Sequence, residues 1–130
     1  MPHLIVEYSA NIEDKIALDG LLDKLHASAV SSGMFPVGGI RIRAMRMDHY
    51  RIADCNPDNG YVHVTALVGH GRPLDFRQRV CEQIFEALTT HLASLFEAAP
   101  LAISFNMQEF HPQLSFKKNN LHEYVRRRSV

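Results

Sequence analysis

The chain has 130 residues, which is enough for one domain with a buried core, and we expect a single domain over 1–130. Apolar residues make up 46% and charged residues 22%, a composition that excludes a disordered chain. Lys and Arg together number 14, as do Asp and Glu, so no net charge favours nucleic acid or an anionic membrane. The apolar runs are far shorter than the roughly 20 residues of a membrane span, and the start lacks the pattern of a signal peptide. We therefore expect a cytoplasmic protein without nucleic-acid or membrane partners.

The first half of the chain predicts a strand, a helix and a second strand. The apolar run at 3–8 is typical of a strand. Leucine and alanine recur at helical spacing over 17–29, before Ser32-Gly33. A turn at 35–39 leads into 40–44, whose alternation of apolar and charged residues predicts a strand.

The second half repeats this order after the turn signal at 56–60. Residues 61–68 predict a strand, and Gly69-His70-Gly71 a glycine-rich turn. Residues 74–96 carry apolar side chains on one face and predict a single helix, and 101–110 predict the last strand. The chain therefore contains two β-α-β units with a period of about 60 residues.

Two fused β-α-β units predict an α+β fold of two layers, with a four-stranded sheet and two helices on one of its faces. The pseudo-repeats span about 2–55 and 61–111, and a C-terminal tail occupies 112–130. A crossover helix requires parallel pairing within each unit. The other face of the sheet is expected to be bare and partly apolar, which favours an oligomer. The tail carries apolar residues that can dock on a neighbour, namely Phe116, Leu121 and Tyr124.

Pro2 follows Met1 directly, and a small residue at this position permits removal of the initiator methionine. Pro2 would then be the N-terminus, and its secondary amine would be a titratable base. The alternative is that Pro2 only begins a strand, a position that tolerates proline. If Met1 is retained, the Pro2 nitrogen is an amide and cannot act as a base.

Two arginines lack counterparts in the opposite pseudo-repeat. Arg72 follows Gly71 at the start of a predicted helix, where backbone N–H groups and the helix dipole favour an anion. Arg41 lies early in a predicted strand where the second unit has Ser104, and with Arg43 on the same face it can equally form a salt bridge. One special amine and two unmatched arginines are typical of a single site on a duplicated scaffold, although sequence drift can produce the same asymmetry.

No metal site or cofactor site is predicted. The 8 histidines are scattered without a close pair at ligand spacing. Cys55 and Cys81 form neither a metal-type spacing nor a disulfide framework. His70, close to Arg72, can border a pocket. A Ser-His-Asp order, a phosphate-binding loop and a dinucleotide fingerprint are all missing from the sequence.

Four separated blocks of the sequence, at 1–9, 35–41, 69–72 and 116–122, resemble the 5-carboxymethyl-2-hydroxymuconate isomerases. This family belongs to the tautomerase superfamily, together with 4-oxalocrotonate tautomerase and macrophage migration inhibitory factor. The resemblance extends over nearly the whole chain. It implies a homotrimer of duplicated β-α-β units, with three sites at subunit boundaries and no cofactor.

The resemblance also implies that Pro2 is the catalytic base and that Arg41 and Arg72 bind an anionic dienol substrate. A base works best with a pKa near the operating pH, and burial and nearby guanidinium groups lower the pKa of an amine. Arginine binds carboxylates in a bidentate manner. It can also stabilise the negative charge that grows on the 2-oxygen as a dienol ionises.

The implied reaction converts 5-carboxymethyl-2-hydroxymuconate to its 2-oxo-3-ene isomer in homoprotocatechuate degradation. The proline would remove a proton at the 2-hydroxyl and return it to a carbon further along the conjugated system. Two alternatives stay open. The chain can be a tautomerase of another 2-hydroxydienoate or of an arylpyruvate, or it can be a non-catalytic module that binds an organic anion.

Overall fold

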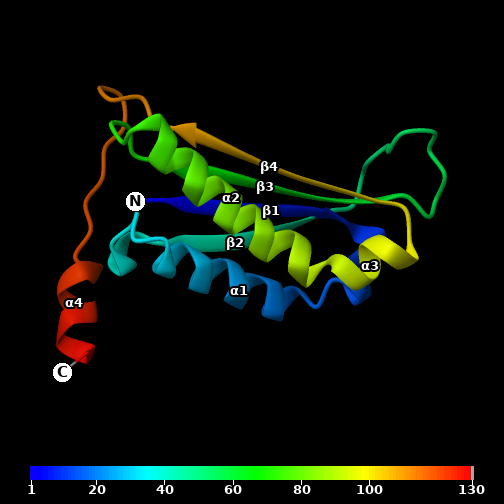
Figure 1. Cartoon of the computed structure of the whole chain (residues 1–130), viewed down its shortest axis with the longest axis horizontal. Coiled ribbons are helices and arrows are strands. Elements are labelled where there is room, and N and C mark those ends of the chain that lie inside the picture. The colour runs from blue at the N-terminus through cyan, green and yellow to red at the C-terminus, as the bar shows by residue number, and fades with distance from the viewer. Residues whose placement is uncertain (130) are drawn as a thin grey trace.

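The computed structural model describes residues 1–129, so Val130, the last residue of the predicted domain and tail, lies outside the described residues. Figure 1 shows the chain as a sheet with its helices, and two short 3₁₀ helices are labelled η here. The elements in chain order are β1 (His3–Ser9), η1 (Ala10–Lys15), α1 (Leu18–Ser31), η2 (Val37–Gly39), β2 (Arg41–Met47), β3 (Gly60–Val68), α2 (Leu74–His91), α3 (Ala93–Ala98), β4 (Leu101–Glu109) and α4 (Leu121–Arg128).

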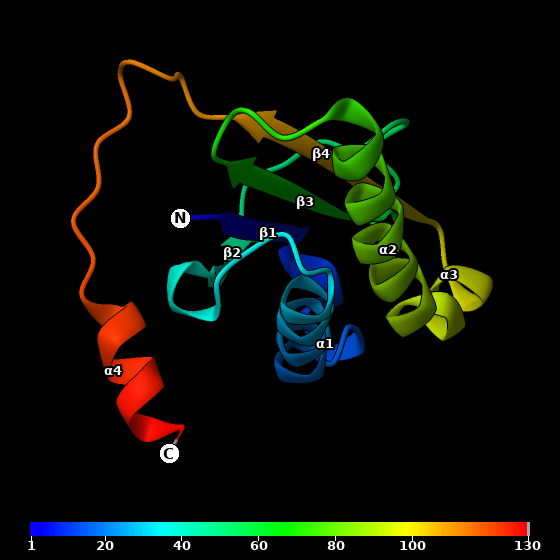
Figure 2. The same ribbon diagram turned by 60° about the vertical axis from the view of Figure 1, so that its left-hand side comes forward.

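The four strands form one mixed sheet in the order β2-β1-β3-β4. β1 pairs in parallel with β2, and β3 pairs in parallel with β4. The two units meet at the centre, where β1 and β3 are antiparallel. Both α1 and α2 lie on one side of the sheet (Figures 1 and 2). The predicted two-layer α+β fold of duplicated β-α-β units is therefore confirmed.

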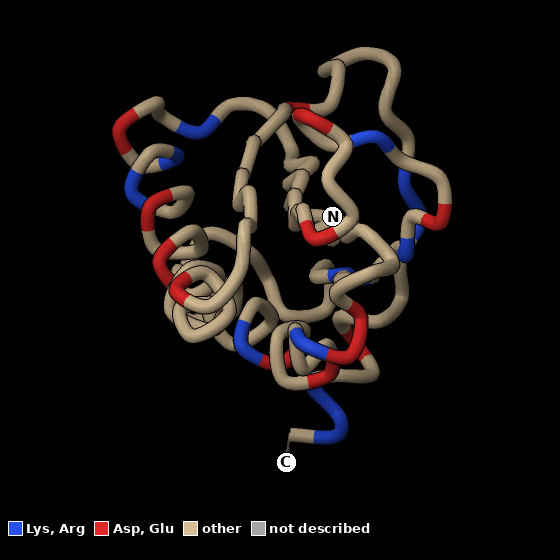
Figure 3. Tube along the Cα trace, turned by 90° about the vertical axis from the view of Figure 1, so that its right-hand side faces the viewer, with Lys and Arg blue, Asp and Glu red and all other residues tan. Residues whose placement is uncertain are grey.

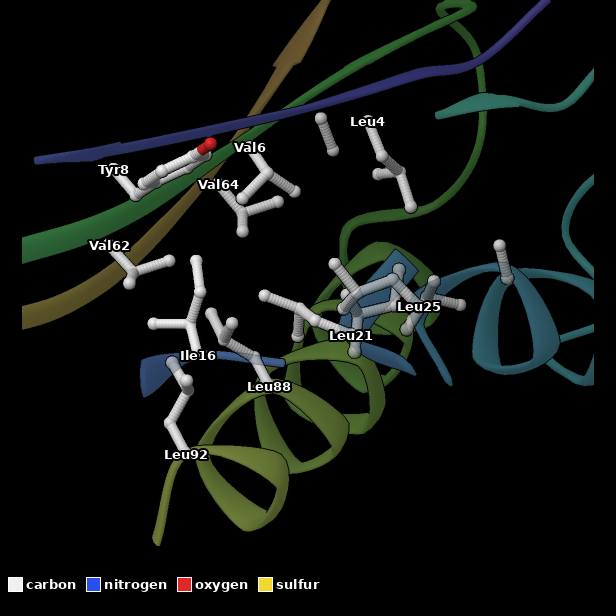
Figure 4. Packing of buried hydrophobic residues seen from close by; sticks show 14 of the residues in the cluster. Leu4, Val6, Tyr8, Ile16, Leu21, Leu25, Val62, Val64, Leu88 and Leu92 are labelled. Atoms are coloured by element: carbon white, nitrogen blue, oxygen red, sulfur yellow. The ribbon is translucent and has the colours of Figure 1, made fainter. Parts of the chain in front are cut away.

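The core lies between the sheet and its two long helices. Because side chains alternate along a strand, every second residue of β1 and β3 points toward the helices. Leu4 and Val6 of β1 and Val64 of β3 are at most 1% exposed. They pack with leucines of both helices, among them Leu21 and Leu88, as Figure 4 shows. The hydrophobic spacing of the sequence thus defines one continuous core.

The opposite face of the sheet carries half-exposed side chains of mixed character. Ile5 and Leu67 are its apolar part in the central strands. The Tyr61 hydroxyl donates a hydrogen bond to Oε2 of Glu7 (2.7 Å) and links β3 to β1. Among residues 1–129, no helix packs on this face in Figures 1 and 2. The predicted oligomer that would cover it stays a prediction.

The helix predicted over 74–96 is interrupted, so this prediction was wrong in one respect. α2 ends at His91 and α3 begins at Ala93. Leu92 has φ −93° and ψ 5°, outside the α-helical region, and its side chain is 1% exposed. The His91 ring nitrogen Nε2 lies 2.8 Å from the carbonyl oxygen of Ile16, which ties the end of α2 to the segment before α1. The chain therefore bends while Leu92 remains in the core.

The predicted tail forms an extended segment followed by a helix. Residues 110–120 leave the end of β4, and α4 follows beside η2, apart from the two-layer body (Figures 1 and 2). Basic residues 126–128 come last in α4, where Figure 3 shows a blue stretch next to the C-terminus. We call residues 111–122 the C-terminal arm. Within the described residues, none of the helices is both long and apolar enough to cross a membrane.

Candidate active site

The topology of the sheet brings four segments to one of its ends. Because β1 and β3 are antiparallel, the start of β1 lies beside the end of β3, with His3 opposite Leu67. Because β2 is parallel to β1, and β4 to β3, β2 also starts at this end and β4 also finishes there. The N-terminus, η2, the β3–α2 turn and the C-terminal arm therefore meet at this end of the sheet (Figure 1).

A cavity of about 380 Å³ lies where these segments meet, and we call it the proline cavity. Its lining includes Met1 and Pro2, residues of the loop before α2, and residues of the arm. A second cavity of about 300 Å³ lies next to it, and Met1, Gly69, His70 and Lys117 line both. Among the residues that line the proline cavity are Pro2, Phe35, His70, Arg72, Lys117 and His122.

Arg72 is held rigidly at the edge of the proline cavity. Gly71 before it has a positive φ of 106°, a conformation that favours glycine and turns the chain from β3 into α2. The guanidinium donates hydrogen bonds to the carbonyl oxygens of Gly69 (3.2 Å) and Met34 (3.0 Å). Its carbon lies 5.5 Å from the centroid of the Phe35 ring, in a cation–π contact. Arg72 therefore presents a fixed positive charge to this cavity.

The turn around Arg72 is held by two residues, Glu109 and Arg77, for which sequence reasoning predicted no role. Oε2 of Glu109 accepts a hydrogen bond from the backbone N–H of Gly71 (3.2 Å). Oε1 of Glu109 lies 3.4 Å from the Arg77 guanidinium. The Arg77 Nε donates to the carbonyl oxygen of Arg72 (2.9 Å). Glu109 and Arg77 thus clamp the turn from β4 and α2.

Arg41 lies beside Pro2 but does not line the proline cavity. Its backbone N–H donates to the carbonyl oxygen of Pro2 (3.0 Å), the bond that precedes the β1–β2 ladder. Its guanidinium donates to the carbonyl oxygen of Gly39 (2.8 Å). Since Arg41 pairs with His3, its side chain lies on the open face of the sheet. The structure thus brings Pro2 and Arg72 to one cavity and leaves Arg41 at its margin.

The electrostatic environment of the N-terminus favours a neutral amine. Burial lowers the pKa of the Met1 α-amino group below its usual value, and the positive charges of Lys117, Arg72 and Arg41 lower it further. Burial also lowers the pKa of His3, together with the charges of Arg43 and Arg41. None of the residues that line the proline cavity is Asp or Glu. An anion in this cavity would therefore meet the positive charges of Arg72 and Lys117 and no acidic side chain in the lining.

Lys117 and His122 line the proline cavity, and sequence reasoning gave them no role. Both lie in the block at 116–122 that carries part of the family resemblance, and this block was the only signal for them. His70 lines the cavity, as expected from its place next to Arg72. Residues 1–129 contain no cluster of three or more His, Cys, Asp or Glu residues with the geometry to hold a metal ion.

Comparisons with known proteins agree with one another over nearly the whole chain. The family model for 5-carboxymethyl-2-hydroxymuconate isomerase matches residues 2–125. An Escherichia coli protein, 5-carboxymethyl-2-hydroxymuconate Delta-isomerase, is 44% identical over 122 residues, which cover 94% of this chain and 97% of that protein.

Solved structures give the same result. The crystal structure of a 5-carboxymethyl-2-hydroxymuconate isomerase from Deinococcus radiodurans R1 has a TM-score of 0.90 at 35% identity, covering 95% of this chain and 93% of that one. A fused 4-OT described as a symmetric trimer has a TM-score of 0.63 at 16% identity, covering 91% and 92% of the two chains, and supports the fold alone. On these matches, the chain belongs to the 5-carboxymethyl-2-hydroxymuconate isomerase family.

Proposed function

We propose that this protein is a 5-carboxymethyl-2-hydroxymuconate Delta-isomerase in which Pro2 is the general base after removal of Met1. The observation that carries the proposal is that Pro2 and Arg72 line one cavity without any acidic residue. The E. coli relative, at 44% identity over most of both chains, bears this activity in its name. The reaction belongs to homoprotocatechuate degradation, and the protein would work in the cytoplasm without a cofactor.

The position of Pro2 suits an amine that must be neutral part of the time. Once Met1 is removed, the chain's α-amine is the Pro2 nitrogen, one residue further into the same cavity. Burial and the charges of Lys117, Arg72 and Arg41, which lower the pKa of the Met1 amine, would act on the Pro2 amine as well. A base with a pKa lowered toward neutrality is both free and able to accept a proton.

The chemistry needs one proton to move within the substrate. Pro2 would take the proton from the 2-hydroxyl of the dienol, and negative charge would grow on the 2-oxygen. As the bond from C2 to oxygen becomes a carbonyl, the C2=C3 and C4=C5 double bonds become single and a C3=C4 double bond forms, with the electron pair released at C5. Pro2 would then return the proton to C5. The guanidinium of Arg72, already fixed before the reaction, would stabilise the charge on the 2-oxygen.

We further propose that the protein is a homotrimer with a site at each subunit boundary. The half-exposed face of the sheet, with Ile5 and Leu67 at its centre, offers a surface that association would bury. Arg41 lies on this face next to Pro2, so a neighbouring subunit would enclose its guanidinium close to the base. Arg41 would in this way share in binding the substrate's carboxylates.

The test begins with the intact mass of the protein, which should lack Met1. Isomerisation is then followed by the ultraviolet change of the dienol for the wild type and for P2A, R72A and R79A. P2A should lose about 10²–10⁴-fold in kcat, and R72A about 10²–10³-fold. Arg79 lies on α2 against Phe76 and lines none of the cavities at the N-terminus, so R79A is the matched control and should behave as the wild type.

Each other outcome has a definite meaning. Full activity in a protein that retains Met1 would exclude Pro2 as the base. Faster turnover of 2-hydroxymuconate or of an arylpyruvate would reassign the substrate within the tautomerases. A processed wild type that binds these anions but turns over none of them would leave the anion-binding module as the function.

A further inference from the structure

Lys117 has no ion-pair partner among residues 1–129 and lies at the end of the sheet where the N-terminus is. It lies in the C-terminal arm and lines both the proline cavity and the second cavity beside it. The second cavity, like the first, has no Asp or Glu in its lining. The ammonium group is therefore available to an anion that extends from one cavity into the other.

The arm that carries Lys117 has a specific seat on η2. The Asn119 side-chain amide donates a hydrogen bond to the carbonyl oxygen of Gly38 (2.9 Å), and its oxygen accepts one from the backbone N–H of Leu121 (2.8 Å). A Cβ at Gly38 would lie 2.9 Å from both the backbone N and the Cα of His122, closer than such atoms pack. The glycine thus permits this close approach, and Lys117 lies only two residues from a fixed anchor.

The number of charges on the proposed substrate exceeds what Arg72 alone can bind. A muconate carries two carboxylates and the carboxymethyl group adds a third. Arg72 lines the proline cavity, and Arg41 does not. Lys117 is the other side chain with a permanent positive charge in that lining. It also reaches the second cavity, which Arg72 does not line, next to His3 and Phe110.

We propose that Lys117 is a specificity-determining residue that binds the carboxymethyl carboxylate, while Arg72 acts at the 2-oxygen end of the substrate. The proposal rests on the proposed function for the identity of the substrate. It adds that the arm distinguishes the tricarboxylate from 2-hydroxymuconate, which lacks the carboxymethyl group. Asn119 and Gly38 are positioning residues that hold Lys117 through the backbone of the arm.

The experiment compares kcat and KM of the wild type, K117Q, K117R and K118Q on 5-carboxymethyl-2-hydroxymuconate and on 2-hydroxymuconate. Because a hydrogen bond between two charged groups is strong, we expect K117Q to lose about 10- to 100-fold in kcat/KM on the tricarboxylate, chiefly through a higher KM. On 2-hydroxymuconate K117Q should match the wild type, and K117R should recover most of the loss. Lys118 is the matched control, because it lines neither cavity and K118Q removes the same charge one residue away.

A binding measurement separates this proposal from the proposed function. Calorimetry with pentane-1,2,5-tricarboxylate, which is adipate carrying one carboxymethyl group, and with adipate itself needs no turnover, and K117Q should weaken binding of the tricarboxylate only. If the wild type isomerises neither dienol, the proposed function fails, and calorimetry still decides whether Lys117 selects the third carboxylate. Equal losses of K117Q on both ligands, no loss on either, or the same loss in K118Q would overturn the role of Lys117.

Discussion

Replacing Gly38 by alanine is expected to release α4 from η2 while leaving the sheet folded. The new Cβ would lie 2.7 Å from Nδ1 of His122 and 2.9 Å from its backbone N and Cα. The imidazole can rotate away, but the backbone atoms move only if α4 moves. Gly38 does not have a positive φ, so alanine fits the local backbone and the perturbation is purely steric.

The size of the effect follows from what holds the arm. Overpacking a fitted contact costs about 1–3 kcal/mol. The hydrogen bond from Asn119 to Gly38, 2.9 Å long, contributes about 0.5–1.5 kcal/mol. Because the steric cost is as large as this bond, the arm should detach rather than remain strained. A change of about 1–2 kcal/mol alters the ratio of seated to detached arm by about 5- to 30-fold.

Hydrogen exchange measured by mass spectrometry reports this change directly. α4 has 8 residues, and a helix that short is not stable in water by itself, so its amide protection depends on its seat. Exchange of the α4 amides should therefore accelerate about 5- to 30-fold in G38A, while the amides of β1 and β3 keep their protection.

Gly20→Ala is the matched control. A Cβ at Gly20 would meet only Cε1 of His91, at 3.4 Å, and the residue lies inside α1. The variant should stabilise the protein by about 0.5–1 kcal/mol and leave exchange in α4 unchanged. If α4 exchange were unchanged in G38A, the contact between Gly38 and His122 would not hold α4. If amide protection were lost throughout the sheet, this contact would belong to the core rather than to a separate seat for α4.

Two further predictions concern stability. Leu88 is completely buried, so L88A should lose about 2–5 kcal/mol of unfolding free energy in urea. The control L74A, at a 69% exposed position, should change the unfolding free energy by less than about 0.5 kcal/mol. Equal losses in the two variants would contradict the assignment of the core. Burial and the hydrogen bond to Glu7 raise the pKa of Tyr61 to about 12 from its usual 10. Because the folded state holds this proton more tightly, the corresponding stability is complete below pH 10 and is lost as the pH rises toward 12. The unfolding free energy of the wild type should fall more steeply over this interval than that of Y61F, and a spectroscopic titration that places the Tyr61 phenol near pH 10 would refute the prediction.

The strands followed from local periodicity and their parallel pairing within each unit from the crossover helices, but neither the antiparallel pairing of β1 with β3 nor the interruption of the second helix did. The alternation in 61–68 and the helical spacing in 17–29 each place the apolar residues on one face of the element, and only that face can pack on the core. In 74–96 the apolar period continues through Leu92 to Leu95, without glycine or proline to mark an end. At the bend, His91 contacts the carbonyl oxygen of Ile16, 75 residues away, and local spacing does not encode a contact of this kind.

Sequence reasoning identified the candidate site residues whose placement depends only on their immediate neighbours in the chain. Pro2 is determined by its place in the chain, and Arg72 by the glycine turn before a helix. The environment of Arg41 depends on which face of β2 it occupies and on the carbonyl of Gly39 that holds its guanidinium. The place of Lys117 depends on a seat in η2 that is far away in the sequence. Such long-range placement was not encoded in any periodic pattern, and the sequence indicated Gly38 and Gly39 only as part of a turn, not as the contact with His122.

The same topology that assembles the proline cavity explains why a duplicated fold has one such site. The pseudo-equivalent end of the sheet is where β3 starts beside the end of β1. There the chain continues without a free amine, and the backbone N–H of Tyr61 is already bonded to Oγ of Ser9 (3.1 Å). η1 closes this end, because a Cβ at Gly60 would lie 2.7 Å from Cγ2 of Ile12. A hollow of about 510 Å³ remains nearby, under the loop 48–59, but neither chain terminus reaches that end in Figure 1. The two ends of the sheet therefore differ because only the end with the proline cavity carries the chain's α-amine. Activity should accordingly require removal of Met1, which exposes this amine.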